Sequence, residues 1–114
     1  MQSYNQEVIF AIVDAGYAEE VMEHAKSCGV SGGTILNARG IARDEAASFF
    51  GIVVHAEKEV LMMVVDSSIK DKVMHAIYSE AGISKHARGI VFSLPVSESI
   101  GLMPSTPPEA AENT

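Results

Sequence analysis

The chain has 114 residues, of which 15 are acidic and 8 are basic, and a formal net charge of −7. This charge excludes general binding to nucleic acids or to anionic membranes, because both need a positive field. The length fits one domain, and a single cysteine, Cys28, excludes an intrachain disulfide and a thiolate metal cluster. We find no secretory signal and no apolar stretch that could span a bilayer, so we expect a cytoplasmic protein that is not membrane-embedded.

The first predicted element is a strand over residues 8–13, because this continuous apolar and β-branched run suits a strand buried on one face and partly buried on the other. Asp14 follows and can accept the free N–H groups at a helix start. Apolar residues then recur at helical spacing: Ala18, Val21, Met22 and Ala25. Gly29 supplies the left-handed residue that ends this helix, and a second strand is predicted over residues 34–38.

The connector of residues 41–50 is longer than a hairpin between two strands needs. It is charged in its first half, and extra loop length on a small scaffold is often where binding function lies. We therefore expect a partner-binding loop whose contact residues are Arg43, Asp44, Phe49 and Phe50. The alternative is a decorated hairpin, and for the two phenylalanines alone we prefer packing on their own sheet.

The second half repeats this order of elements. A strand is predicted over residues 60–65, and Asp66 can cap the helix after it. The apolar stripe of that helix is Ile69, Val73, Ala76 and Ile77. The helix ends at Gly82, and a last strand covers residues 90–94 before Pro95 limits its pairing. Residues 1–103 then form the domain, and residues 104–114 form a Pro-containing acidic tail.

The two halves align as an internal repeat. Residues 52 positions apart are identical at Glu7/Glu59, Val8/Val60, Val13/Val65, Asp14/Asp66, Val21/Val73 and Met22/Met74. With a further shift, Ala38-Arg39-Gly40 matches Ala87-Arg88-Gly89. A strand–helix–strand unit taken twice predicts an α+β fold, the ferredoxin-like βαββαβ sandwich, in which two helices cover one face of an antiparallel sheet.

Several motifs occur in a characteristic order: Gly32-Gly33-Thr34, Ala38-Arg39-Gly40, a mid-chain excursion before Glu57-Lys58-Glu59, and the Gly-bounded basic loop of residues 82–89. Over roughly residues 8–102 this order resembles the PII family of nitrogen regulatory signalling proteins, in particular its short, divergent members. The resemblance implies a homotrimer that binds adenine nucleotides in clefts between subunits. It also implies that the mid-chain loop engages a partner protein.

The resemblance further implies which residues line the cleft. Glycines let backbone amides approach an anion, and hydroxyl, imidazole and cationic side chains bind it. The implied ligand residues are Gly33, Thr34, Arg39, Gly40, Lys85, His86, Arg88 and Gly89. Lys58 also matches a family ligand position, although a surface salt bridge explains it equally well. Its neighbours Glu57 and Glu59 suggest solvated charges at a strand start.

The chain also departs from the family pattern. Asp44 replaces the Gln that helps to hold magnesium and 2-oxoglutarate, and residues 41–55 contain no Tyr for uridylylation. Ile90 stands where the family has a Lys, and Gly101-Leu102-Met103 stands where it has Arg-x-Arg. Each lost charge-assisted phosphate contact costs about 1.5–3 kcal/mol, so ATP should bind weakly and AMP or ADP is the expected effector.

We therefore expect a PII-like trimeric signalling protein that senses AMP, ADP or a related anion. Its mid-chain loop would regulate a membrane transporter or a metabolic enzyme. The sequence contains no nucleophile elbow, Walker loop or paired metal-ligand spacing, so we assign no catalytic residue, metal or resident cofactor and do not expect an enzyme. The alternative is a trimeric protein–protein adaptor that has lost nucleotide binding.

Overall fold

The computed structural model describes residues 5–41, 55–85, 87 and 89–101, and its elements follow the predicted order. The first half consists of β1 (Gln6–Asp14), α1 (Ala18–Ser27) and β2 (Thr34–Ile41). The second half consists of β3 (His55–Asp66), a 3-10 turn (Ser67–Ile69), α3 (Lys70–Ser79) and β4 (Ile90–Pro95). The predicted tail, residues 104–114, lies outside the described residues.

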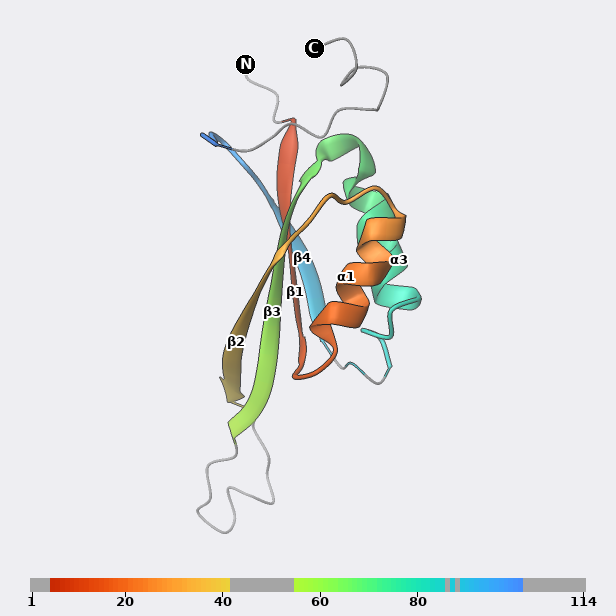
Figure 1. Ribbon diagram of the computed structural model, residues 1–114, viewed down its shortest axis with the longest axis vertical. Coiled ribbons are helices and arrows are strands. Elements are labelled where there is room, and N and C mark those ends of the chain that lie inside the picture. The colour runs from red at the N-terminus through yellow and green to blue at the C-terminus, as the bar shows by residue number, and fades with distance from the viewer. Residues whose placement is uncertain (1–4, 42–54, 86, 88, 102–114) are drawn as a thin grey trace.

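The four strands form one antiparallel sheet in the order β2-β3-β1-β4. Helices α1 and α3 lie side by side on one face of this sheet, as Figure 1 shows. This is the ferredoxin-like α+β arrangement expected for a duplicated strand–helix–strand unit, so the predicted fold class is confirmed.

Alternate residues of the central strands form the core. Under the helices lie Ile9, Ala11 and Val13 of β1 and Leu61, Met63 and Val65 of β3, all of them buried. A period of two is what a sheet covered on one face requires. The apolar stripe predicted for the first helix is buried. Of the stripe predicted for the second helix, Val73 and Ile77 are buried, whereas Ile69 and Ala76 are partly exposed. Among the described residues, no polar or charged side chain is buried in this core.

The opposite face of the sheet, called the open face below, is also apolar. Its residues are the even-numbered ones: Val8, Phe10, Ile12, Leu36, Val60, Met62, Val64, Ile90, Phe92 and Leu94. All of them stay partly or fully exposed within the described chain. The rings of Phe10 and Phe92 stack with centroids 5.1 Å apart, which joins β1 to β4 on this face.

The sheet register corrects one part of the repeat alignment. Thr34 of β2 pairs with Met62, and Phe92 of β4 pairs with Phe10. Met62 and Phe10 are equivalent residues of the two copies, because they are 52 positions apart. Their partners Thr34 and Phe92 are therefore equivalent as well, although they are 58 positions apart. The two Ala-Arg-Gly segments are only 49 positions apart, and the first of them, residues 38–40, lies within β2 whereas the second precedes β4. Their predicted match is therefore wrong.

The ends of the helices follow the sequence signals at two of four predicted places. Gly29 has a φ angle of 106° directly after the C-cap Cys28, as the predicted left-handed end of α1 requires. Gly82 is also left-handed, with a φ angle of 86°, but α3 ends earlier, at Ser79 with Glu80 as its C-cap, so the predicted helix end at Gly82 is wrong. The Asp66 carboxylate accepts a hydrogen bond from Ser68 N at 3.0 Å, as predicted. The start of α1 is different, because its N-cap is Tyr17 and not Asp14, and Tyr17 makes no side-chain capping bond.

Candidate anion-binding site

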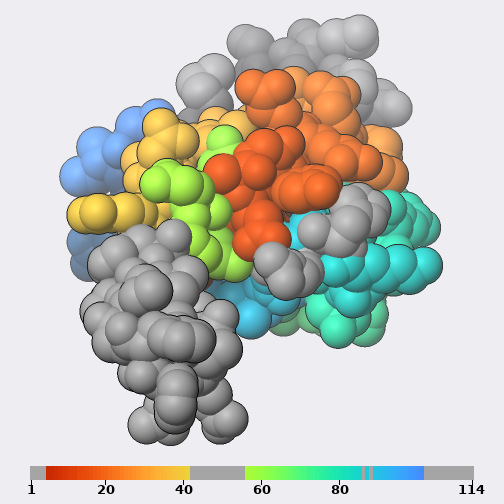
Figure 2. All heavy atoms as spheres, turned by 90° about the horizontal axis from the view of Figure 1, so that it is seen from below, coloured from red at the N-terminus to blue at the C-terminus, as the bar shows by residue number. Residues whose placement is uncertain are grey.

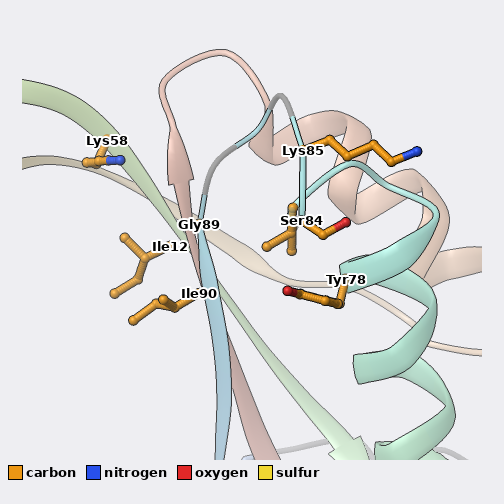
Figure 3. A pocket seen from close by; sticks show the side chains of 8 residues that line it. Ile12, Lys58, Tyr78, Ser84, Lys85, Gly89 and Ile90 are labelled. Atoms are coloured by element: carbon orange, nitrogen blue, oxygen red, sulfur yellow. The ribbon is translucent and has the colours of Figure 1, made fainter.

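The loop between α3 and β4 forms one side of an open pocket of about 410 Å³. Figure 3 shows the pocket between this loop, the end of α3 and the strands β1 and β4. Apolar side chains of Ile12, Ile83 and Ile90 contribute to its lining. Its polar groups come from Lys58, Tyr78, Ser84 and Lys85. A pocket with an apolar wall and a few cationic and hydroxyl groups can hold a small anion that carries an apolar part.

Backbone hydrogen bonds shape the pocket loop. Gly82 O accepts bonds from Lys85 N at 3.0 Å and from Ala87 N at 2.9 Å, and Ala87 O accepts a bond from Asp14 N at 2.9 Å. The side chains of Ile83 and Ala87 are buried in the core. The loop is therefore anchored both within itself and to the end of β1, so that it presents a defined backbone to the pocket.

Gly89 is required by the close approach of this loop to β1. A Cβ atom at this position would lie only 2.1 Å from Ile12 O and 2.9 Å from Val13 Cγ1. Because backbone atoms cannot move aside as a flexible side chain can, no other residue fits here without displacing the loop. Gly33 has a similar role at the entrance to β2, where a Cβ would lie 3.0 Å from Met62 O.

Lys58 enters the pocket from β3, where it lies directly opposite Asp14 of β1. Lys58 Nζ donates to Asp14 Oδ1 at 2.6 Å, and the two side chains are 24% and 22% exposed. The aliphatic part of Lys58 packs over Gly40, where a Cβ would lie 3.3 Å from Lys58 Cγ. The missing side chain of Gly40 thus makes room for Lys58, which is a structural reason for a glycine at this position.

Glu59, the next residue of β3, holds the turn that leads into α1. Its Oε1 accepts hydrogen bonds from Gly16 N at 2.8 Å and from Ala18 N at 3.1 Å. A carboxylate at this place satisfies free N–H groups of the helix start and opposes the positive end of the helix dipole. The predicted capping role of Asp14 therefore belongs to Glu59, and Glu59 is not the solvated charge that the sequence suggests.

The β1–α1 turn is tied to β3 by its backbone as well. Ala15 N donates to Glu57 O at 3.1 Å, one residue before Lys58. Figure 2 looks onto this end of the molecule, where the first residues of β3, in green, lie against the red to orange turn after β1. The residues that cap the helix and the lysine that reaches the pocket therefore come from one short segment of β3.

The structure separates the predicted ligand residues into two groups. Lys85 and Gly89 line the pocket beside β4, although Figure 3 shows the Lys85 side chain extending away from Lys58. Gly33, Thr34, Arg39 and Gly40 belong to β2 or its entrance, at the opposite edge of the sheet. Three strand spacings separate the edges, which is about 14 Å.

Within β2 the predicted ligands are also spread out, because Thr34 and Gly40 are six residues apart and hence about 20 Å apart along the strand. Arg39 is exposed and lies opposite Glu57 of β3. The remaining predicted site residues, His86 and Arg88 in the pocket loop and Arg43, Asp44, Phe49 and Phe50 in the mid-chain connector, lie outside the described residues. Their roles stay predictions.

Two further observations limit the chemistry in the described part of the chain. Its His, Cys, Asp and Glu side chains form no group of three that could hold a metal ion. None of its helices is long and apolar enough to cross a membrane.

The fold and the pocket define a ferredoxin-like α+β domain with a lysine-bearing site beside one sheet edge. The chain belongs to the nitrogen regulatory protein P-II family, whose model matches residues 6–105. Proteins of this family are regulators and not enzymes, and they are generally trimeric.

Among solved structures, the chain is similar to Arabidopsis thaliana PII, which was crystallised with bound citrate. The two share 23% sequence identity with a TM-score of 0.60, over 83% of this chain and 78% of the Arabidopsis chain. At this identity the likeness supports the fold alone. No curated protein sequence matches the chain.

Proposed function

We propose that the chain is a homotrimeric, cytoplasmic PII-type regulator that senses a small anion in a cleft between subunits, with AMP or ADP as the preferred ligand. The regulated partner would be a membrane transporter or a metabolic enzyme, engaged through the mid-chain connector. The observation that carries the proposal is the pocket itself, which combines Lys58, Lys85 and Gly89 with an apolar wall at one edge of the sheet.

The apolar open face supports self-association. Ile90, Leu94 and Leu36 are 58%, 52% and 46% exposed in one chain, on a face that the two helices do not cover. Contiguous apolar surfaces of this kind mark protein contacts, because covering them removes apolar area from water. A second copy of the chain is the occupant that fits best, since the family is generally trimeric.

A ring of three copies would also complete the site. In one chain the β2 residues Arg39 and Gly40 lie at the edge opposite Lys85 and Gly89. A head-to-tail interface joins two different surfaces of the same molecule and closes into a ring when the rotation allows. Such a ring would bring the β2 edge of one copy to the β4 edge of the next, so that the two groups of predicted ligands meet between subunits.

The lining of the pocket favours an anion with a flat apolar part. Lysine side chains and a free hydroxyl bind phosphate or carboxylate oxygens by charge-assisted hydrogen bonds. Ile12, Ile83 and Ile90 offer an apolar wall to a ring such as adenine, and the Tyr78 ring lies nearby. The citrate bound to Arabidopsis PII is itself a small anion, which agrees with this class of ligand.

Calorimetric titration of the full chain with AMP, ADP, ATP, cyclic nucleotides and bicarbonate tests the proposal. We expect AMP or ADP to bind below millimolar concentration and more tightly than ATP. Lys85→Gln and Arg39→Gln should each weaken binding, whereas the control Lys72→Gln, on the exposed side of α3, should not. Absence of binding by every compound at millimolar concentration contradicts the proposal.

One observation favours the second candidate, a trimeric adaptor without a ligand. The Lys58 ammonium is already paired with Asp14, which reduces its attraction for another anion. The adaptor hypothesis predicts that Arg39→Ala and Arg88→Ala leave capture of the partner protein unchanged in pull-down assays. Loss of the partner with both variants would refute it.

A further inference from the structure

Asp14 and Lys58 form an ion pair at the boundary of the pocket. They are direct neighbours across β1 and β3, and both project from the open face of the sheet. The distance of 2.6 Å between Asp14 Oδ1 and Lys58 Nζ is that of a short, charge-assisted hydrogen bond. Lys58 lines the pocket, so the cation that an incoming anion meets is one that already has a carboxylate partner.

This pair changes the electrostatics of the pocket. A paired ammonium and carboxylate have no net charge, and the carboxylate repels an anion that approaches the ammonium. An ammonium has three donor hydrogens, so an anion can share Lys58 only while it lies close to the Asp14 carboxylate. Binding is therefore easiest for a ligand with enough negative charge to draw the ammonium away.

Other contacts hold the structure around the ion pair. Asp14 N donates to Ala87 O, and the β1–α1 turn is held by the bond from Ala15 N to Glu57 O and by the Glu59 carboxylate. These contacts do not use the Asp14 side chain or the Lys58 ammonium. These contacts would therefore remain if Lys58 left Asp14.

We propose that Asp14 is a built-in competitor for Lys58, which lowers the affinity of the pocket for anions and selects multiply charged ligands over singly charged ones. The inference rests on the proposed anion site and names the residue that limits its affinity for anions. Asp14 touches the cation and is not itself among the residues that line the pocket. Phosphate groups with two negative charges would open the pair, whereas bicarbonate would not.

The test compares full-length wild-type protein with Asp14→Asn, Lys58→Gln and the double variant by calorimetry, with ADP and inorganic pyrophosphate as probes. Asparagine keeps the size of the side chain and removes its charge. We expect Asp14→Asn to bind both probes about ten-fold more tightly, which is the order of effect of one partly screened charge close to a ligand. In the Lys58→Gln background most of this gain should disappear.

Glu7→Gln is the matched control, because Glu7 is another carboxylate of β1 that faces a lysine, Lys70, at 4.0 Å at the other end of the strand. It should leave both affinities unchanged. Circular dichroism checks the fold, and Asp14→Ser replaces Asp14→Asn in the same comparison if the latter does not fold.

The possible outcomes separate this inference from the proposed function. If the wild type binds and Asp14→Asn binds no more tightly, the competitor role is refuted and the anion site stands. A gain that persists undiminished in Lys58→Gln also refutes the role. If only Asp14→Asn binds the probes, the competitor role of Asp14 is supported and anion sensing by the wild type is contradicted. If neither protein binds them, the competitor role and the proposed anion sensing are both contradicted.

Discussion

Phe10 lies directly opposite Met62 in the register of β1 and β3, and the two residues are 52 positions apart, which is the spacing of the internal repeat. Equivalent residues of the two copies therefore face each other at this point. The approximate two-fold axis of the domain passes between them, and Thr34 and Phe92 flank them in the same row of the sheet. The duplication that the sequence predicts from residue identities thus has a defined centre on the open face.

The open face provides a test of trimerisation. Leu94→Glu would place a charge on an apolar surface that we propose is buried between subunits, where an unpaired charge is costly. Light scattering should give about three times the chain mass of 12.1 kDa for the wild type and a smaller mass for Leu94→Glu. Ser97→Glu adds the same charge at an exposed position outside β4 and should keep the wild-type mass. A wild-type monomer at micromolar concentration contradicts the prediction.

Gly89→Ala should destabilise the domain. The added Cβ would overlap Ile12 O, so the pocket loop must move away from β1, and overpacking of this kind costs at least about 2 kcal/mol. For a chain of this size, Tm should fall by roughly 10 °C. Gly32→Ala is the control, because a Cβ there meets no atom within 4 Å. Equal melting temperatures for the two variants would show that the loop does not need the glycine.

Glu59→Ala should lower the free energy of unfolding by about 1–2 kcal/mol, because Gly16 N and Ala18 N lose their shared acceptor. Glu59→Gln keeps an acceptor oxygen and should cost less. Glu57→Ala serves as the control, since Glu57 is exposed and contributes its backbone carbonyl to the turn. Urea denaturation measures all three variants. A loss for Glu57→Ala as large as that for Glu59→Ala would rule out capping as the cause.

Asp66 should make part of the stability depend on pH. The hydrogen bond from Ser68 N favours the ionised carboxylate and lowers the pKa of Asp66 below its usual value of 3.8. A lowered pKa stabilises the folded state above pH 3.8, and this contribution is lost as the pH falls through the folded-state pKa. The stability difference between wild type and Asp66→Ala should therefore narrow between pH 5 and pH 2. A difference that stays constant over this range contradicts the assignment, and Glu98→Gln in the exposed segment after β4 is the control.

Much of the fold is predictable because the periods of strand and helix are local properties. The runs at residues 8–13 and 60–65 identify β1 and β3, and Pro95 ends β4 as predicted. The start of β3 is the main exception, since it begins at residue 55 and includes Glu57, Lys58 and Glu59. These charged residues are in a strand because they pair with β2, and their own composition gives no signal of that pairing.

The candidate site is less predictable, because its contacts join distant residues. Lys58 and Asp14 are 44 positions apart, and Glu59 and Ala18 are 41 positions apart, so neither contact has a local pattern. The resemblance to the PII family indicates Lys85 and Gly89, which line the pocket. It groups them with Arg39 and Gly40, but only the strand order shows that these lie on the other edge of the sheet.

The strand order β2-β3-β1-β4 has one more consequence. All three ladders of the sheet join strands from different copies of the repeat, since β1 pairs with β3 and β4, and β2 pairs with β3. Neither copy contains both strands of any pair, so half of the chain alone would have no partner for the backbone hydrogen bonds of its strands. The protein therefore suits a split-fragment complementation assay: residues 1–50 and 51–114, each unfolded alone, should assemble a sheet when mixed.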